Sequence, residues 1–168
     1  MRDLQQNWDF DVTGKRILIF GAGGAAQGII APLLDANPDV VLIANRTTAK
    51  ADALAHHFGS LGNVETTRFN DIRGGHEAYD LIINATSAGL DGEQAPFPRA
   101  AITERHTVCY DLSYSLSTTP FVRWAKTMDA AKTRSGWGML IEQAAESFRI
   151  WRGVMPDTHE VIKRLPVT

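Results

Sequence analysis

Short runs of apolar residues alternate along the chain with stretches of helical spacing. The clearest run covers residues 16–20, which read Arg-Ile-Leu-Ile-Phe and are bounded by Gly14 and Gly21. A continuous apolar run of this length is typical of a strand that is buried on both faces of a parallel sheet. This run and five others predict six strands, over residues 16–20, 40–44, 64–69, 80–84, 107–111 and 132–134. The run over residues 64–69 alternates apolar and polar residues.

Apolar residues three or four positions apart predict helices between and after these strands. The expected helices cover residues 24–36, 47–58, 119–129 and 139–151, and a short final helix opens at Pro156. Pro32 lies inside the first of these helices. We expect it to kink that helix, because its ring opposes the carbonyl group of Gly28.

Strands that alternate with helices predict βαβ units, and therefore an α/β protein with a Rossmann-like, doubly wound fold. We expect a mostly parallel six-stranded sheet in the order 3-2-1-4-5-6, with helices on both faces, over residues 15–168. Residues 1–14 stand outside the alternation, because Trp8, Phe10 and Val12 lack a partner strand. We interpret residues 1–14 as a lead-in from a further N-terminal domain, or as an arm that packs on the sheet.

Length and composition favour one soluble globular domain. The 168 residues are 44% hydrophobic, and 17 basic against 19 acidic residues give a net charge of −2. This balance argues against a nucleic-acid partner, and no apolar run approaches the roughly 20 residues that span a bilayer. The single cysteine, Cys109, is expected to be inert core and suits a reducing, cytoplasmic location. The spacing of the five histidines predicts no metal site.

The segment after the first strand matches the glycine pattern of dinucleotide-binding loops. Residues 21–26 read Gly-Ala-Gly-Gly-Ala-Ala and open the first predicted helix. Gly21 permits a tight turn, Gly23 lets the backbone approach a pyrophosphate, and Ala26 is small enough for the helix to pack closely on the strand. The N–H groups at the start of the helix would bind the anion, so dinucleotide binding is favoured over a plain connecting turn.

The end of the second strand predicts which dinucleotide binds. A site for NAD would carry Asp or Glu there to accept a bond from the ribose 2′-hydroxyl. This chain has Asn45, Arg46 and Thr47 instead, followed by Lys50. A guanidinium group holds a 2′-phosphate, which a carboxylate would repel, so the residues favour NADP(H). The alternative is that Arg46 and Lys50 are solvent-exposed residues at the start of the next helix, with no ligand. Thr47 either donates a hydrogen bond from its hydroxyl to the phosphate or caps that helix.

Polar residues also follow the fourth and fifth strands, at the sheet edge where ligands lie in such folds. Residues 84–89 include Thr86 and Ser87, whose small side chains let a nicotinamide ribose pass, although a polar turn explains them equally well. Tyr114 offers a hydroxyl to a substrate, or is a buried structural tyrosine.

The start of the last long helix carries the remaining candidates. Gly136 and Met139 would bring backbone and a thioether near the nicotinamide, unless Met139 simply fills the core. Gln143 lies one turn beyond Met139 and would reach a polyol in the same crevice. We interpret Asp111, at a strand end without a nearby histidine, as structural rather than catalytic.

Together these motifs resemble those of shikimate dehydrogenases, in order along nearly the whole chain. The matching segments are GAGGAA (21–26), NRT (45–47), NATSAG (84–89), YDLSY (110–114) and GWGMLIEQAA (136–145). That family reduces 3-dehydroshikimate to shikimate with NADPH. The resemblance implies a pyrophosphate site at Gly21, Ala22, Gly23, Gly24 and Ala25, a 2′-phosphate site at Asn45, Arg46, Thr47 and Lys50, nicotinamide contacts from Leu112, Gly136 and Met139, and shikimate contacts from Tyr114 and Gln143.

The chain also departs from the family pattern. The family has an N-terminal substrate domain with a catalytic Lys–Asp pair and a serine motif, and nothing in residues 1–14 resembles these. Gln27 stands where an arginine is usual, and Ser135 replaces a usual aspartate. We therefore expect the cofactor-binding half of the enzyme, with no catalytic residue of its own, weak binding of shikimate and little or no turnover.

Two other functions stay open on the sequence. The chain is alternatively a non-catalytic nucleotide-binding module, or a protein related to quinate/shikimate dehydrogenases. The resemblance also implies an exposed apolar interdomain surface, through which copies of the chain would self-associate.

Overall fold

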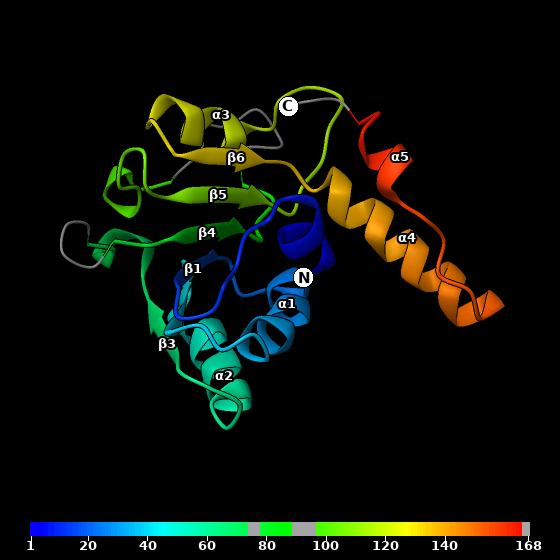
Figure 1. Cartoon of the computed structure of the whole chain (residues 1–168). Coiled ribbons are helices and arrows are strands. Elements are labelled where there is room, and N and C mark those ends of the chain that lie inside the picture. Colours follow the sequence, from blue (N-terminus) through cyan, green and yellow to red (C-terminus); the bar gives the residue numbers. More distant parts are fainter. Residues whose placement is uncertain (74–77, 89–96, 166–168) are drawn as a thin grey trace.

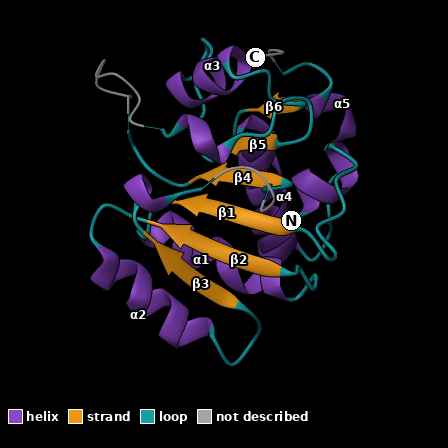
Figure 2. Cartoon of the chain, turned by 90° about the vertical axis from the view of Figure 1, so that its left-hand side faces the viewer, coloured by secondary structure: helices purple, strands orange, loops and turns teal. Residues whose placement is uncertain are grey.

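Six parallel strands form one sheet in the order β3-β2-β1-β4-β5-β6. The computed structural model describes residues 1–73, 78–88 and 97–165. Figure 2 shows the strands as arrows that point the same way. Their bounds are β1 Arg16–Phe20, β2 Val40–Ala44, β3 Val64–Thr67, β4 Leu81–Asn84, β5 Val108–Asp111 and β6 Lys132–Arg134. The predicted fold class and strand order are confirmed.

Helices cover both faces of this sheet (Figure 1). Residues Ile17 and Ile19 of β1 pack toward α1 and α2, whereas Leu18 and Phe20 pack toward α3 on the opposite face. All four side chains are fully buried, which explains why the strand reads as a continuous apolar run. The helices are α1 Gly24–Leu34, α2 Thr48–Phe58, α3 Pro120–Thr127, α4 Trp137–Arg152 and α5 His159–Ile162, with short turns η1 Asp3–Asn7, η2 Phe69–Asp71 and η3 Arg99–Ala101.

Several element boundaries differ from the predicted ones. The third strand ends at Thr67, because Phe69 starts a 3-10 turn and stacks on Phe20 instead of continuing the ladder. Pro32 lies within α1, which ends at Leu34 and not at residue 36. The last helix is also shorter than predicted, and begins at His159.

Residues 1–14 pack on the α1 face of the sheet and form no strand. Leu4 and Val12 join the core of that face, and the indole of Trp8 meets the Tyr110 ring edge-on at 5.7 Å. Figure 1 shows this segment beside α1 and the start of α4. Of the two expectations for this segment, packing on the sheet is confirmed.

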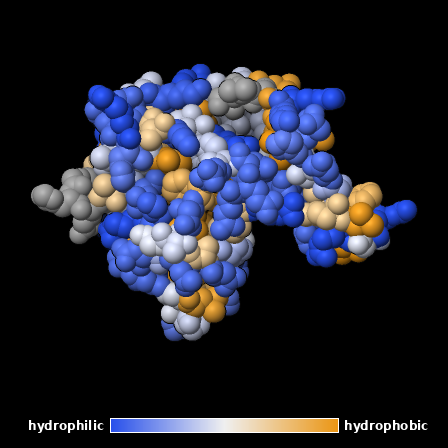
Figure 3. All heavy atoms as spheres, viewed as in Figure 1, coloured by the Kyte–Doolittle hydropathy of each residue, from blue (hydrophilic) through white to orange (hydrophobic). Residues whose placement is uncertain are grey.

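The distal half of α4 extends away from the sheet (Figure 1). Its side chains include apolar residues that the described structure leaves exposed, among them Ile150 at 67% and Trp151 at 79%. Figure 3 shows apolar atoms gathered at the end of this projection. None of the described helices is both long and apolar enough to cross a bilayer.

Candidate functional site

Gly21 fixes the loop between β1 and α1. Its φ of 102° lies in a region that side chains with a Cβ rarely adopt. A Cβ at this position would also lie 2.8 Å from the Thr86 methyl carbon. The Gly21 N–H donates to the carbonyl of Ala44 at 2.8 Å, so the loop is held to the ends of both β2 and β4. This contact explains why glycine is needed at the first position of the motif.

The next residues leave room for a ligand at the start of α1. A Cβ built on Gly23 or Gly24 would meet no atom within 4 Å. Gly23 is the N-cap residue of α1 and has no side chain to satisfy the N–H groups of the first turn. Ala26 is fully buried, as close packing of the helix on the sheet requires. Open space above free N–H groups fits a pyrophosphate.

Two basic residues, and no acidic one, follow the end of β2 in residues 45–50. Asn45 shapes the turn, because its side-chain amide donates to the Thr47 carbonyl at 2.8 Å. Arg46 and Lys50 are exposed, and neither forms an ion pair with any residue in the described ranges. Thr47 is the N-cap of α2 without a side-chain capping bond, so its hydroxyl is not used by the helix. This arrangement fits a 2′-phosphate.

The predicted nicotinamide-ribose segment is a tightly bonded turn. The Thr86 hydroxyl donates to Asn84 Oδ1 at 2.7 Å and accepts from the Ala88 N–H at 3.2 Å. Ser87 is exposed, whereas Gly89 lies outside the described residues. Thr86 therefore shapes the turn, and Ser87 is the hydroxyl presented to solvent.

Asp111 is buried at the end of β5 and serves the structure. Its carboxylate accepts from the Asn84 amide at 2.9 Å, the Ser113 N–H at 3.0 Å and the Thr119 hydroxyl at 2.5 Å. Burial raises the pKa of this carboxyl group and outweighs these bonds. The contacts agree with the structural role predicted for Asp111.

Burial also raises the pKa of the Cys109 thiol, which agrees with an inert core cysteine.

A cavity of about 380 Å³ lies between η1, α1 and α4. It brings together three of the predicted residues, Leu112, Met139 and Gln143. Tyr114 is not part of its lining, and its ring contacts that of Trp137 at a tilted angle, with ring centroids 5.1 Å apart. Gly136 is crowded, since a Cβ there would lie 2.5 Å from the Leu112 carbonyl oxygen. Leu112 thus lies beside Gly136 and lines the cavity together with Met139, while Tyr114 contacts the first residue of α4 and does not line the cavity.

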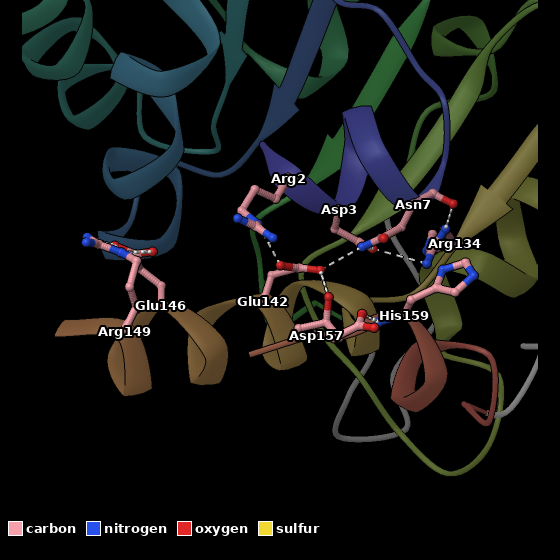
Figure 4. A network of polar contacts seen from close by, with 10 residues as sticks. Arg2, Asp3, Asn7, Arg134, Glu142, Glu146, Arg149, Asp157 and His159 are labelled. Carbon is pink, nitrogen blue, oxygen red and sulfur yellow. Dashed lines mark hydrogen bonds and ion pairs between the residues drawn. The ribbon is translucent and has the colours of Figure 1, made fainter. Parts of the chain in front are cut away.

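The sequence alone missed a polar network that joins the N-terminal turn to α4 (Figure 4). Glu142, only 7% exposed, accepts from Arg2 at 2.8 Å, from Asn7 at 3.0 Å and from Thr158 at 2.8 Å. Asp3 is 4% exposed and accepts a very short bond from the Tyr110 hydroxyl. One signal was available, because Gly138 leaves space that the Asp3 carboxylate occupies.

Comparisons with known proteins agree with this geometry. The family model described as shikimate/quinate 5-dehydrogenase matches residues 3–94, and that of the shikimate 5′-dehydrogenase C-terminal domain matches residues 136–165. The shikimate dehydrogenase (NADP(+)) of Methylococcus capsulatus is 50% identical over 98% of this chain and 58% of its own length. The chain thus spans about three-fifths of the length of its curated relatives.

Solved structures show the same relationship. The Ael1 enzyme of Pseudomonas putida superposes with a TM-score of 0.87 and 37% identity, over 99% of this chain and 60% of its own. The shikimate 5-dehydrogenase of Thermus thermophilus, solved with NADP(H) and shikimate, gives a TM-score of 0.76 and 31% identity, over 92% of this chain and 55% of its own. The chain therefore belongs to the shikimate/quinate 5-dehydrogenase family.

Proposed function

We propose that this chain is the NADP(H)-binding part of a shikimate dehydrogenase, which reduces 3-dehydroshikimate to shikimate. The observation that carries the proposal is the exposed pair Arg46 and Lys50, in a segment, residues 45–50, that contains no acidic residue. NAD sites place a carboxylate at this point, and a 2′-phosphate needs cations. The curated relatives are named NADP(+) enzymes.

Each part of the dinucleotide has its own set of residues in this proposal. The N–H groups at the start of α1 hold the pyrophosphate, and the β2 turn holds the 2′-phosphate. Ser87, with Thr86 behind it, lies along the nicotinamide ribose. The sets are Gly21, Ala22, Gly23, Gly24 and Ala25 for the pyrophosphate, Asn45, Arg46, Thr47 and Lys50 for the 2′-phosphate, Leu112, Gly136 and Met139 for the nicotinamide, and Tyr114 and Gln143 for the substrate.

Bound NADPH supplies the hydride, so the protein must orient the two reactants and provide a proton to the carbonyl oxygen. Three buried carboxylates lie near the proposed site, those of Asp3, Asp111 and Glu142. Each accepts hydrogen bonds from other residues of the protein. We assign no proton donor to this chain. Shikimate therefore binds weakly to the chain alone, and turnover requires the part of the relatives that this chain does not match.

The apolar end of α4 is the surface that we assign to that remaining part. Phe148, Ile150 and Trp151 of α4, with Val154 just after the helix, are between 46% and 79% exposed. Exposed patches of this kind mark interfaces. The relatives are longer than this chain, which covers 58% of the Methylococcus capsulatus sequence, and we assign the substrate domain to the uncovered part. Residues 1–14 are then the lead-in from that substrate domain.

The single buried cysteine is in keeping with a reducing cytoplasm.

Isothermal titration and an activity assay test the proposal together. We expect the chain to bind NADP⁺ more tightly than NAD⁺ and to show no oxidation of shikimate by itself. Adding the unmatched N-terminal part of the Methylococcus capsulatus relative as a separate polypeptide should restore activity. Trp151→Asp should weaken this rescue, and Leu61→Asp, at an exposed leucine between α2 and β3, should not. Equal affinity for NAD⁺ and NADP⁺ would refute the proposal, and activity of the chain alone would refute the need for a partner.

A further inference from the structure

The side chain of Asn84 is buried at the end of β4, where only 2% of it is exposed. Its amide nitrogen donates to the Asp111 carboxylate, at the end of β5, at 2.9 Å. Its carbonyl oxygen accepts from the Thr86 N–H at 3.1 Å and from the Thr86 hydroxyl at 2.7 Å. The Thr86 hydroxyl in turn accepts from the Ala88 N–H at 3.2 Å. One buried side chain therefore fixes the course of residues 84–88.

Asp111 extends the same network into the turn after β5 and into α3. Its carboxylate accepts from the Ser113 N–H at 3.0 Å and from the Thr119 hydroxyl at 2.5 Å, and that hydroxyl caps the start of α3. The backbones of the two turns are joined as well, because the Leu112 N–H donates to the Asn84 carbonyl at 2.9 Å. A continuous set of hydrogen bonds therefore runs from the start of α3, through Asp111 and Asn84, to the turn after β4.

Both turns lie on the same side of β1. In the sheet, β4 and β5 follow β1 in one direction, and β2 and β3 follow it in the other (Figure 2). A dinucleotide in such a fold lies across the carboxyl ends of the strands, with one mononucleotide half on each side of the point where the strand order reverses. The proposed 2′-phosphate site at the end of β2 takes the adenosine half. The turns after β4 and β5 therefore lie beside the nicotinamide half.

We infer that Asn84, held by Asp111, is a positioning residue that fixes residues 84–88 for the nicotinamide ribose. This inference rests on the proposed function, since it takes Thr86 and Ser87 to lie along that ribose. Asn84 acts through the turn and does not itself need to touch the ligand. A turn that is already fixed does not have to be ordered when the ligand binds, so the network strengthens binding of the nicotinamide half. The adenosine half does not depend on it.

Asn84→Ala tests this, because it removes the side chain that joins Asp111 to the turn. We compare by calorimetry the binding of NADP⁺ and of adenosine 2′,5′-bisphosphate, which has the adenosine and its 2′-phosphate but neither the nicotinamide nor its ribose. We expect NADP⁺ affinity to fall about fivefold, the effect of one ordinary hydrogen bond, with the bisphosphate changed less than about twofold. Amide exchange at Thr86 and Ala88 should become faster.

Thr107→Val is the matched control. The Thr107 side chain is fully buried just before β5, at the opposite end of the strand from Asp111. Its hydroxyl donates to the Tyr79 carbonyl at 2.8 Å and accepts from the Thr103 N–H at 2.9 Å. The variant therefore also loses buried hydrogen bonds, but away from the proposed site, and it should change neither affinity.

Asp111→Asn separates the position of the turn from the charge of the carboxylate. Asparagine keeps an oxygen for the Asn84 amide and the Ser113 N–H, and its own amide donates to the Thr119 hydroxyl oxygen. NADP⁺ affinity should therefore stay within about twofold of the wild-type value. A loss as large as that of Asn84→Ala would overturn the inference, because the charge of Asp111 would then carry the effect.

Each outcome with Asn84→Ala decides the inference. Equal losses for both ligands, or no loss for NADP⁺, would overturn it, because a general loss of structure does not distinguish the two halves of the dinucleotide. If Asn84→Ala does not fold, Thr86→Val must show the same selective loss, since the Thr86 hydroxyl bonds to both Asn84 and Ala88, and the absence of that loss overturns the inference. Failure of the wild-type protein to bind adenosine 2′,5′-bisphosphate would instead refute the proposed function, so the two failures are distinguishable.

Discussion

Single residues of the nucleotide loop act through backbone geometry. Gly21 combines a positive φ with a close approach to the Thr86 turn, while Gly23 and Gly24 have free space where a side chain would stand. The same residue type therefore serves two purposes in one loop. The first glycine holds the loop together, and the next two leave open space at the start of α1, where we propose that the pyrophosphate binds.

Replacing Gly21 with alanine separates these purposes. We expect Gly21→Ala to lower the free energy of unfolding by about 1–3 kcal/mol, because the residue is strained and its Cβ would be too close to Thr86. Gly28→Ala is the matched control, inside α1 with open space around it, and should stabilise the fold by about 0.5–1 kcal/mol. Urea unfolding measures both. A Gly21→Ala protein as stable as wild type would contradict the strained loop.

Glu142 gives the fold a dependence on pH. Burial alone would raise its pKa, but hydrogen bonds from Asn7, Thr158 and Arg2 outweigh burial and lower the pKa below its ordinary value of 4.5. A lowered pKa in the folded state means that the ionised group stabilises the fold above the unfolded pKa. This contribution is lost as the pH falls through the folded pKa.

We therefore expect Glu142→Gln to cost stability at neutral pH and little in acid. The loss should be about 1–2 kcal/mol at about pH 7, and should shrink as the pH falls below the ordinary pKa of the carboxyl group and through its lowered pKa in the folded protein. Urea denaturation of both proteins at neutral and acid pH checks this. A difference that stays constant with pH would show that the charge of Glu142 does not contribute.

At the scale of elements, α4 is placed by its contacts with η1 and not by the sheet alone. The N-cap residue of α4 is Gly136, which offers no side chain to the N–H groups of the first turn. The N-terminal turn packs closely on the start of α4, because the Asp3 carboxylate lies where a Cβ of Gly138 would stand. The position of α4 therefore depends on residues that come before the first strand.

A double-mutant cycle tests this approach. Gly138→Ala alone should lower the melting temperature by several degrees, since the new methyl group meets the Asp3 carboxylate, which its partners hold in place. In an Asp3→Ala background the space is free, so the further cost of Gly138→Ala should nearly vanish. If the change in melting temperature of the double variant equals the sum of the two single changes, Asp3 and Gly138 are not in contact.

At the scale of the whole molecule, the sheet and its order follow from local patterns. Each central strand is apolar on both faces, and each is followed by a helix, so periodicity alone predicts a parallel sheet with helices on both faces. The glycine loop and the β2 turn are local as well, which is why both were predicted at the correct sheet edge. Boundaries at Phe69 and in the last helix depend on tertiary packing, and these predictions were wrong by a few residues.

The polar network could not be predicted in the same way. Asp3 and Tyr110 are 107 positions apart, and Arg2 and Glu142 are 140 apart, so no local pattern joins them. Charged residues are mostly exposed in folded proteins, so the sequence predicts that a charged residue in an N-terminal segment faces solvent. Only the fold brings these residues together, on a segment that sequence periodicity placed outside the domain. The roles of the cofactor and substrate residues stay predictions that binding experiments must test.

The central claim is that cations at the end of β2 select the phosphorylated dinucleotide, and Arg46→Glu tests it most directly. The measurement is the ratio of dissociation constants for NAD⁺ and NADP⁺, by calorimetry on wild type and variant. Losing a charge-assisted contact and adding repulsion should weaken NADP⁺ binding by about 10- to 100-fold, while NAD⁺ binding is retained. A ratio that is the same in both proteins would contradict the account.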